Sequence, residues 1–358
     1  AANYLAELFW REGLKPQVTE SEPGRGNVTV RIPGGSEPPF MLLGHTDVVA
    51  AEPEKWTHPP FEGGLYDGYV WGRGTLDMKD MVAAELMVIL LLKRQGVFLN
   101  RDLIFAATAD EEAGKGNHGI GWLLDNHPDQ VDAPFVLTEG GGTNFRVGER
   151  RFYGCQTGQK GIFRFRLKAV GKPGHGSMPH GENALVHLCK VVSELGKAEF
   201  PLHMSGTLEA FLDGIAKTQD LETATLFRDV SHSERGEAAL KALPVEKEMV
   251  SRLRSLLRNT VSPTMLKAGS KINVIPSEAT AWLDGRLVPG QTKESFLAEI
   301  RPYLGESVEV EVDQYNPALE TGTDSPLYQV IIDVMEKHDP EAVVLPEIIT
   351  GGTDAKHI

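Results

Sequence analysis

Carboxylate side chains and one histidine stand beside apolar runs in the first 140 residues of the chain. They form four groups: His45 and Asp47, then Asp77, then Asp110-Glu111-Glu112, and then Glu139. Nitrogen and oxygen ligands without a thiolate suit Zn²⁺, Co²⁺ or Mn²⁺. Each group alone also fits an ordinary role, as a strand-end histidine, a carboxylate at a helix N-terminus or an exposed acidic turn. Together they predict a divalent-metal site and make hydrolysis the first reaction to consider.

The spacing within these groups indicates different tasks for neighbouring residues. His45 and Asp47 are two residues apart, so in an extended chain they project to one side, where the carboxylate can hold the second imidazole nitrogen. Asp77 follows a glycine-rich turn, a constrained position of the kind that a carboxylate bridging two metals needs. Glu111 and Glu112 are adjacent and point in different directions, so one can bind metal while the other stays free as a base.

The surrounding elements predict how these groups meet. Apolar runs at 40–44, 103–108 and 133–138 indicate buried strands, and the patterns at 78–94 and 120–126 indicate helices. Strands that alternate with helices favour an α/β fold with a mostly parallel sheet. The carboxyl ends of parallel strands converge on one crevice, so the four groups are expected at one edge of the sheet.

The pattern changes in the second part of the chain. Alternating strands are expected at 162–170, 271–275, 279–287 and 307–312, with helices at 183–199 and 324–337 and a strand at 342–345. Residues 200–262 are polar and helix-favouring and carry no recognisable chemistry. We therefore predict a catalytic domain at 1–158 and 315–358, with an inserted α+β domain at 159–314.

This inserted region contributes further candidates for chemistry. His175 lies in the loop Gly171-Lys172-Pro173-Gly174-His175-Gly176-Ser177, either as an exposed loop residue or as a hydrogen-bond donor to a developing oxyanion. Asn273 and Arg286 fall on consecutive expected strands. Arg286 follows Asp284 closely, so it forms either a surface ion pair or a fork for a substrate carboxylate.

Composition excludes several classes of function. The net charge of −14 argues against a nucleic-acid partner and against an anionic membrane surface. No run of about 18 apolar residues is present, so no transmembrane helix is expected. Cys155 and Cys189 make no disulfide framework, which favours a reducing, cytoplasmic location. Asn27-Val28-Thr29 is a glycosylation sequon that matters only in a secreted protein.

These motifs, in this order, resemble the M20 family of metallopeptidases and aminoacylases, most closely its carboxypeptidase S-like branch. The resemblance runs over nearly the whole chain. The matching pieces are Gly44-His45-Thr46-Asp47, Gly72-Arg73-Gly74-Thr75-Leu76-Asp77-Met78-Lys79, Asp110-Glu111-Glu112, Glu139-Gly140-Gly141, Gly174-His175-Gly176-Ser177, Asn273-Val274-Ile275-Pro276 and Gly351-Gly352-Thr353-Asp354.

The resemblance implies a site with two divalent metals, usually zinc. His45, Asp77 and Glu139 would hold one metal, and Asp77 and Glu112 would hold the other. Asp47 would orient His45, and Glu111 would be the base that takes a proton from a metal-bound water. His175 would stabilise the oxyanion, often across a dimer in this family. The substrate carboxylate would be bound by Asn273, Arg286, Gly351 and Gly352. The inserted domain would be the lid and dimerisation domain.

The resemblance also implies the substrate, a small peptide or N-acyl amino acid with a free carboxylate. Two alternatives stay open: a deacylase for another N-acetyl or N-succinyl metabolite, and a non-catalytic metal-binding relative. One departure matters. The family's last metal ligand is a histidine some tens of residues beyond Asp354, whereas this chain stops at Ile358. His357 is not assigned as that ligand, so we expect the sequence to be truncated, with its second metal short of one ligand.

Overall fold

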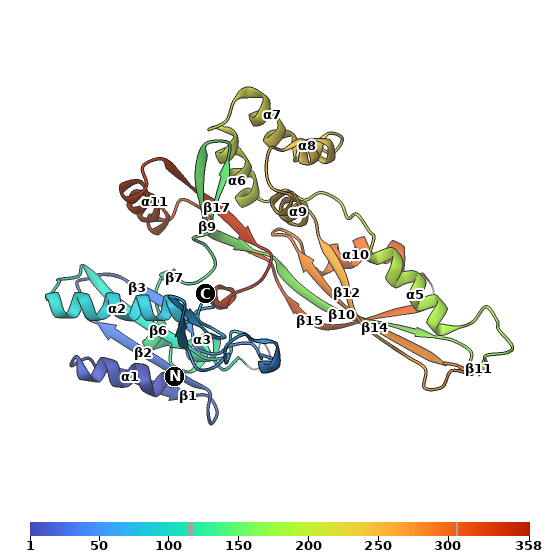
Figure 1. Ribbon diagram of the computed structural model, residues 1–358, viewed down its shortest axis with the longest axis horizontal. Coiled ribbons are helices and arrows are strands. Elements are labelled where there is room, and N and C mark those ends of the chain that lie inside the picture. The colour runs from blue at the N-terminus through green and yellow to red at the C-terminus, as the bar shows by residue number, and fades with distance from the viewer. Residues whose placement is uncertain (113–116, 306) are drawn as a thin grey trace. The chain divides into compact units, whose positions relative to one another are not determined.

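The chain divides into two compact units in its computed structural model, which describes residues 1–112, 117–305 and 307–358 (Figure 1). Unit 1 contains Ala1–Glu139 and Thr353–Ile358, and unit 2 contains Gly140–Gly352. Unit 2 is thus an insertion between the two segments of unit 1. The functional boundaries expected from the sequence, 158/159 and 314/315, fall inside unit 2, and the assignment of catalytic and lid parts stays a prediction.

Unit 1 is built from one five-stranded sheet with helices on both faces. In chain order its elements are α1 (Ala2–Arg11), β1 (Gln17–Glu20), β2 (Gly26–Ile32), β3 (Glu37–His45), η1 (Pro53–Lys55), β4 (Gly64–Tyr66), β5 (Tyr69–Trp71), α2 (Lys79–Gln95), β6 (Arg101–Thr108), α3 (Ile120–Asn126), α4 (Pro128–Val131), β7 (Phe135–Leu137) and η2 (Asp354–His357).

The strand order of this sheet is β1-β2-β6-β3-β7. Strand β3 runs parallel to both β6 and β7, whereas β2 runs antiparallel to β1 and β6. The predicted α/β class is confirmed, and the sheet is mixed: parallel around β3 and antiparallel around β2. Because β3, β6 and β7 are parallel neighbours, their carboxyl ends meet at one edge.

The core of unit 1 follows the two-residue periodicity of its strands. Leu42 of β3 packs with α1 and α2 on one face, while Met41 and Leu43 pack with α3 and α4 on the other. Phe9 of α1 meets Phe105 of β6 edge to face, with ring centroids 5.1 Å apart. Burying each such ring stabilises the fold by roughly 1.5–3 kcal/mol.

Unit 2 carries two larger sheets and a group of helices. Its elements are β8 (Asn144–Val147), β9 (Arg150–Gln159), β10 (Gly161–Val170), β11 (Gly174–His175), α5 (Ala184–Leu195), α6 (Gly206–Ala216), α7 (Leu221–Asp229), α8 (Gly236–Ala242), α9 (Lys247–Leu256), β12 (Thr260–Ala268), β13 (Val274–Ile275), β14 (Glu278–Leu287), α10 (Lys293–Leu304), β15 (Val308–Asn316), β16 (Leu319–Glu320), α11 (Pro326–His338) and β17 (Ala342–Ile349).

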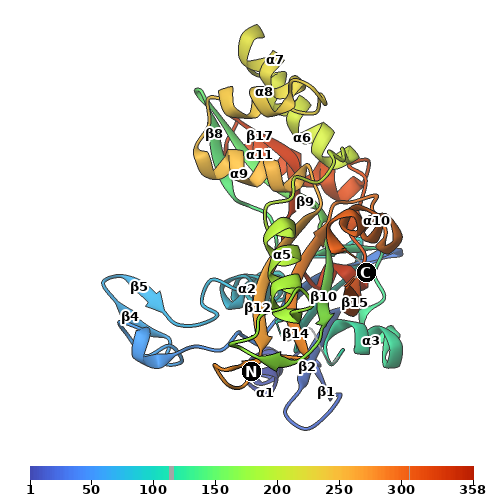
Figure 2. The same ribbon diagram turned by 90° about the vertical axis from the view of Figure 1, so that its right-hand side faces the viewer.

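The antiparallel sheet of unit 2 has the order β12-β14-β10-β15. Helices α5 and α10 cover one of its faces, and Figure 2 shows α5 in front of the strands. The expected strands at 162–170, 279–287 and 307–312 are confirmed. The prediction at 271–275 was wrong in extent, since only Val274–Ile275 is a strand there. The edge strand β12 was missed because its first residues were assigned to the polar stretch 200–262.

The second sheet of unit 2 pairs β9 with β17 in parallel and with β8 and β16 in antiparallel. Helices α6 to α9 occupy most of residues 200–262 and share an apolar core with β9 and β17. Across the described residues, none of the helices combines the length and apolar character that crossing a bilayer requires.

Candidate metal centre

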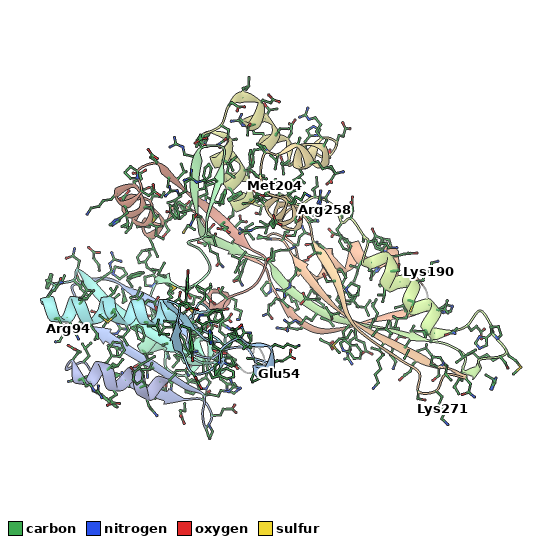
Figure 3. The ribbon with its side chains drawn as sticks, in the orientation of Figure 1. Glu54, Arg94, Lys190, Met204, Arg258 and Lys271 are labelled. Atoms are coloured by element: carbon green, nitrogen blue, oxygen red, sulfur yellow. The ribbon has the colours of Figure 1, made fainter. Side chains whose placement is uncertain are left out.

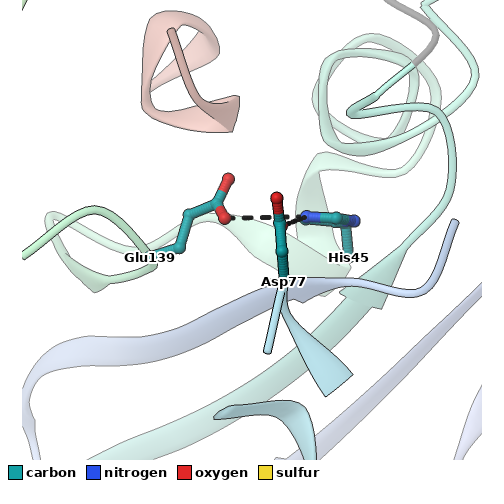
Figure 4. A group of neighbouring side chains, drawn as sticks. All are labelled: His45, Asp77 and Glu139. Carbon is teal, nitrogen blue, oxygen red and sulfur yellow. Dashed lines mark hydrogen bonds and ion pairs between the residues drawn. The ribbon is translucent and has the colours of Figure 1, made fainter. Parts of the chain in front are cut away.

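Three of the predicted ligands come together at the carboxyl edge of the sheet in unit 1. His45, Asp77 and Glu139 each offer one ligand atom, and these atoms lie within 4.8 Å of one another. Nε2 of His45 is 3.1 Å from Oδ1 of Asp77 and 3.6 Å from Oε2 of Glu139, as Figure 4 shows. One nitrogen and two oxygen donors in this arrangement make a donor set for a divalent cation.

The fold explains why these three side chains meet. His45 is the last residue of β3, and Glu139 follows the end of the neighbouring parallel strand β7. Asp77 stands two residues before the start of α2. Helix α2 approaches β3 so closely that a Cβ on Gly44 would lie 2.6 Å from Val82, so only glycine allows this packing.

Asp47 connects the histidine to the acidic turn beyond β6. Its Oδ1 is 3.4 Å from Nδ1 of His45, and its backbone oxygen is 3.1 Å from the same nitrogen. The two carboxylate oxygens accept hydrogen bonds from the backbone N–H groups of Glu111 and Glu112, at 3.2 and 3.1 Å. One carboxylate therefore fixes both the imidazole and the turn that carries the two glutamates.

The electrostatics of this cluster favour a bound cation. Burial alone would lower the pKa of His45, but its hydrogen bonds to Asp47 and Glu139 raise that pKa to about 11. Burial would likewise raise the pKa of Asp47, and the bonds from His45 and from the backbone lower it instead. The carboxylates thus hold a positive charge on the ring, and a divalent cation can supply that charge. The residues present fit a metal.

Glu111 and Glu112 differ in their surroundings, as the sequence suggested. The Glu111 carboxylate is largely buried and lies 3.9 Å from Nζ of Lys356. Burial and the Glu139 charge raise the pKa of Glu111 to about 7, against the lowering effect of Lys356. Glu112 lies outside the three-residue cluster, yet burial and the Asp77 charge raise its pKa as well.

Two residues of this region were missed as parts of the site. Asp354 is buried, accepts a hydrogen bond from Thr108 at 3.2 Å, and lies 3.8 Å from Nζ of Lys356. Burial raises the pKa of Asp354 to about 6. Lys356 thus stands between Asp354 and Glu111. The motif Gly351-Gly352-Thr353-Asp354 had drawn attention to this part of the sequence. Only the tertiary fold shows that Asp354 lies at the end of β6, beside Thr108.

His175 and Asn273 lie together at one tip of the antiparallel sheet in unit 2. His175 pairs with Val274, and the Gly176 N–H donates to the Asn273 carbonyl at 2.8 Å. Nδ1 of His175 accepts the Ser177 N–H at 3.3 Å. In the neutral imidazole the proton therefore sits on Nε2, which is the form that donates to an oxyanion.

Arg286 is held by an ion pair, as its spacing to Asp284 had suggested. Its Nε and Nη2 donate to the two oxygens of Asp284, at 2.6 and 3.2 Å. Its Nη1 is 3.5 Å from the carbonyl of Thr350, next to Gly351 and Gly352. This pairing fixes the plane of the guanidinium.

Within unit 2, the structure does not bring Arg286 close to His175 and Asn273. Arg286 is opposite Ile162 at the start of β10, whereas Glu278, just after the Asn273 segment, is opposite Val170 at its end. Eight residues of strand separate those positions, which is roughly 26 Å. Figure 3 labels Arg258 near one end of this sheet and Lys271 in the loop at the other.

Comparison with protein families gives one match to most of the chain. Residues 41–358 match the model described as peptidase family M20/M25/M40.

Two curated relatives are similar over most of the chain. A probable carboxypeptidase S-like 2 of Dictyostelium discoideum is 30% identical over 334 residues, covering 89% of this chain and 62% of the relative. An N-fatty-acyl-amino acid synthase/hydrolase of Xenopus tropicalis is 30% identical over 331 residues, with the same two coverages. The chain thus spans less than two thirds of the length of either relative.

Among solved structures, the fold is similar to that of an M20 family metallo-carboxypeptidase from Sulfolobus solfataricus. The TM-score is 0.69 and the sequence identity is 20%, over 99% of this chain and 82% of that one. At this identity the likeness concerns the fold.

Proposed function

The chain belongs to the M20/M25/M40 peptidase family, and on this basis we propose a metal-dependent hydrolase that cleaves an amide bond in a small peptide or N-acyl amino acid. The observation that carries the proposal is the cluster of His45, Asp77 and Glu139 beside the buried carboxylate of Glu111. A cation site next to a carboxylate that is not part of it is what metal-assisted hydrolysis requires.

His45, Asp77 and Glu139 would hold one divalent cation, and Asp77 and Glu112 would hold a second. Zinc suits this nitrogen and oxygen donor set, and cobalt or manganese are the alternatives that metal analysis decides. Such cations polarise the scissile carbonyl and make water a better nucleophile at neutral pH. Asp47 would keep His45 in the orientation and tautomer that binding requires.

Glu111 would act as the general base. Its carboxylate takes a proton from the attacking water and then gives it to the leaving amine. Its burial and its place outside the three-residue cluster support this role, because a carboxylate that does not itself bind the cation can accept a proton and return it.

Arg286 would bind the free carboxylate of the substrate, with the backbone of Gly351 and Gly352 beside it. The bidentate Asp284 pair orients the guanidinium, and such a fork matches a carboxylate in shape. The names of the two relatives, a carboxypeptidase and an N-fatty-acyl-amino acid hydrolase, point to substrates that carry such a carboxylate.

His175 would stabilise the tetrahedral oxyanion, with Asn273 beside it, and we place this pair in the site of a second subunit. The roughly 26 Å of strand between Arg286 and Glu278, which follows the Asn273 segment, supports the arrangement, because a fully extended dipeptide spans only about 7 Å. One substrate cannot contact both ends of one sheet. A homodimer through the inserted lid domain would bring the tip of one chain to the substrate of the other.

The test uses the purified full-length protein and its bound metals. Metal content is measured, the protein is stripped with a chelator, and hydrolysis is assayed before and after adding Zn²⁺, Co²⁺ or Mn²⁺. The substrate panel contains dipeptides, N-fatty-acyl, N-acetyl and N-succinyl amino acids, and the same compounds with an amidated carboxyl group. We expect activity to vanish on stripping, to return with metal, and to require the free carboxylate.

Each contrary result points to a named alternative. Cleavage of only N-acetyl or N-succinyl compounds identifies a deacylase of another metabolite. Metal binding without cleavage of any panel compound identifies a non-catalytic relative, and full activity in the stripped protein rejects the metal mechanism.

A further inference from the structure

Residues 109–112, which carry Glu111 and Glu112, lie against residues 117–119. The first segment follows the end of β6 at Thr108, and the second ends at Gly119, just before α3. A Cβ on Gly119 would lie 2.0 Å from the carbonyl oxygen of Ala109, so a residue without a side chain is required where the ends approach. We use the name catalytic loop for residues 109–112 and 117–119 alone, since 113–116 lie outside the described residues.

One side chain outside the loop ties both ends. Asn27 of β2 is fully buried, with an exposed fraction of 0%. Its Oδ1 accepts the backbone N–H of Ala109 at 2.9 Å, and its Nδ2 donates to the carbonyl of His118 at 2.9 Å. The amide group therefore spans the two ends and satisfies one buried backbone group on each.

The hairpin of β1 and β2 adds further contacts to the same ends. Arg25 donates to Oδ1 of Asp110 at 3.3 Å, and the His118 N–H donates to Oδ2 of Asp110 at the same distance. The Ser21 hydroxyl lies 3.0 Å from Nδ1 of His118. Arg25, Ser21 and His118 are partly exposed to solvent, whereas Asp110 and Asn27 are buried, and the Asn27 amide contacts the backbone of both ends.

We propose that Asn27 is a positioning residue for catalysis: by closing the catalytic loop it sets where Glu111 and Glu112 stand relative to the ligand cluster. Asp47 holds the N–H groups of both glutamates from the metal side, and Asn27 holds the loop ends from the side of β2. A turn fixed from both sides has little freedom to move its carboxylates. The roles of the two glutamates rest on the proposed function, whereas the loop closure itself does not.

The burial of Asn27 also bears on whether the glycosylation sequon can be modified in the folded chain. Asn27 is the asparagine of Asn27-Val28-Thr29, and its amide nitrogen is both enclosed and hydrogen-bonded. In the folded chain it is not accessible to a glycosyl transfer, and its amide serves the loop instead.

The experiment compares Asn27→Leu with Thr29→Val, a matched control on the same strand. Thr29 is also buried, and its hydroxyl donates to Gln130 at 2.9 Å, away from the catalytic loop. Amide hydrogen exchange of peptides within 109–119 is the first readout, Co²⁺ titration with its absorption spectrum the second, and steady-state kinetics the third. The Co²⁺ spectrum reports ligand geometry independently of turnover.

For Asn27→Leu we expect at least about 10-fold faster exchange in the 109–119 peptides and a changed Co²⁺ spectrum. We expect kcat to fall about 10- to 100-fold with KM within about 2-fold, because misplaced catalytic groups slow the chemical step. Thr29→Val should leave all three unchanged. Asn27→Asp keeps the acceptor for Ala109 and loses the donor to His118, so it should fall between wild type and Asn27→Leu.

The proposal is overturned if exchange in 109–119 and the Co²⁺ spectrum are unchanged in both Asn27 variants, or if Thr29→Val alters them equally. If Asn27→Leu does not fold, Asn27→Asp alone decides between these outcomes. Failure of the proposed function is a separate result: the wild type then lacks metal-dependent hydrolysis while the exchange data still report the loop closure.

Discussion

His45 in unit 1 and His175 in unit 2 both stand at the end of a strand, but one is enclosed and the other is open to solvent. The side chain of His45 is 1% exposed, and both ring nitrogens face carboxylates. His175 is exposed, and Nδ1 of its ring lies 2.8 Å from the Ser177 hydroxyl. The contrast teaches that the fold of unit 1 fixes the orientation of its histidine through buried neighbours, whereas the histidine at the tip of unit 2 is open to solvent.

Buried titratable side chains also differ between the two units, and here it is the residue of unit 2 that has hydrogen-bond partners. Lys160 of unit 2 is 1% exposed, and its Nζ donates to the carbonyls of Ser255 and Arg258 and to the Thr260 hydroxyl. Glu85 of unit 1 is 5% exposed, and neither carboxylate oxygen has a hydrogen-bond partner among the described residues. Hydrogen bonds offset the cost of burying the Lys160 amine, whereas the Glu85 carboxyl is buried without such compensation.

The largest effect is expected from Glu111→Gln, which tests whether unit 1 supplies the base. We expect kcat to fall about 10²- to 10⁴-fold, because the substitution removes proton transfer and little else. Bound metal, measured by elemental analysis, should stay unchanged, since the ligands are elsewhere. Glu54→Gln, an exposed carboxylate of the same unit, serves as the control and should keep full turnover. A Glu111→Gln protein with wild-type kcat would remove Glu111 from the mechanism.

The next effect tests whether the open tip of unit 2 acts in a second subunit. His175→Ala should lower kcat about 10²- to 10³-fold, as loss of one oxyanion donor does. A heterodimer of His175→Ala with Glu111→Gln, co-expressed with two different tags, should recover up to half of the wild-type activity. One of its two sites then has an intact Glu111 from one chain and an intact His175 from the other. No recovery would mean that the tip acts within its own chain.

A smaller effect, on KM, is expected for Arg286, which lies at the opposite end of the antiparallel sheet of unit 2 from His175. Arg286→Ala should raise KM about 10- to 100-fold for a substrate with a free carboxylate and leave the amidated analogue unaffected. The matched control is Arg164→Ala, because Arg164 also lies 3.6 Å from Asp284 on the neighbouring strand. An equal rise in KM for both substrates, or for both variants, would contradict carboxylate recognition by Arg286.

The smallest effect concerns stability alone and tests Glu85. Burial raises the pKa of Glu85 to about 8 in the folded chain, from an ordinary value near 4.5. Between these values the unfolded chain releases the proton and the folded chain keeps it, so stability falls as pH rises from about 4.5 to 8. Relative to Glu85→Gln, the wild type should lose about 2–5 kcal/mol between pH 5 and 9.

Urea unfolding of the metal-free proteins measures this difference. Glu52→Gln, an exposed carboxylate of unit 1, should follow the wild type at every pH. Parallel curves for the wild type and Glu85→Gln would show that Glu85 is charged in the folded chain.

Much of the ligand cluster followed from the sequence, because each ligand stands beside a strand or a turn that local pattern identifies. His45 and Glu139 stand at or just after the ends of apolar runs, and parallel neighbours bring such ends together. Asn27 gave no comparable signal, since nothing near residue 27 indicates that its amide reaches a loop more than 80 positions later. Strand β12 was also missed, because its exposed edge lacks the alternation that marks a half-buried strand.

The sequence by itself determined the family, the α/β class and the chemistry of the metal ligands, since these depend on residue types at short spacing. Only the tertiary structure decided which groups share an environment. It placed Asp354 and Lys356 beside Glu111, buried Asn27 and Glu85, and set His175 and Arg286 at opposite ends of one sheet. The physical reason is that burial, hydrogen bonding and charge coupling act through space, between residues that the chain order separates.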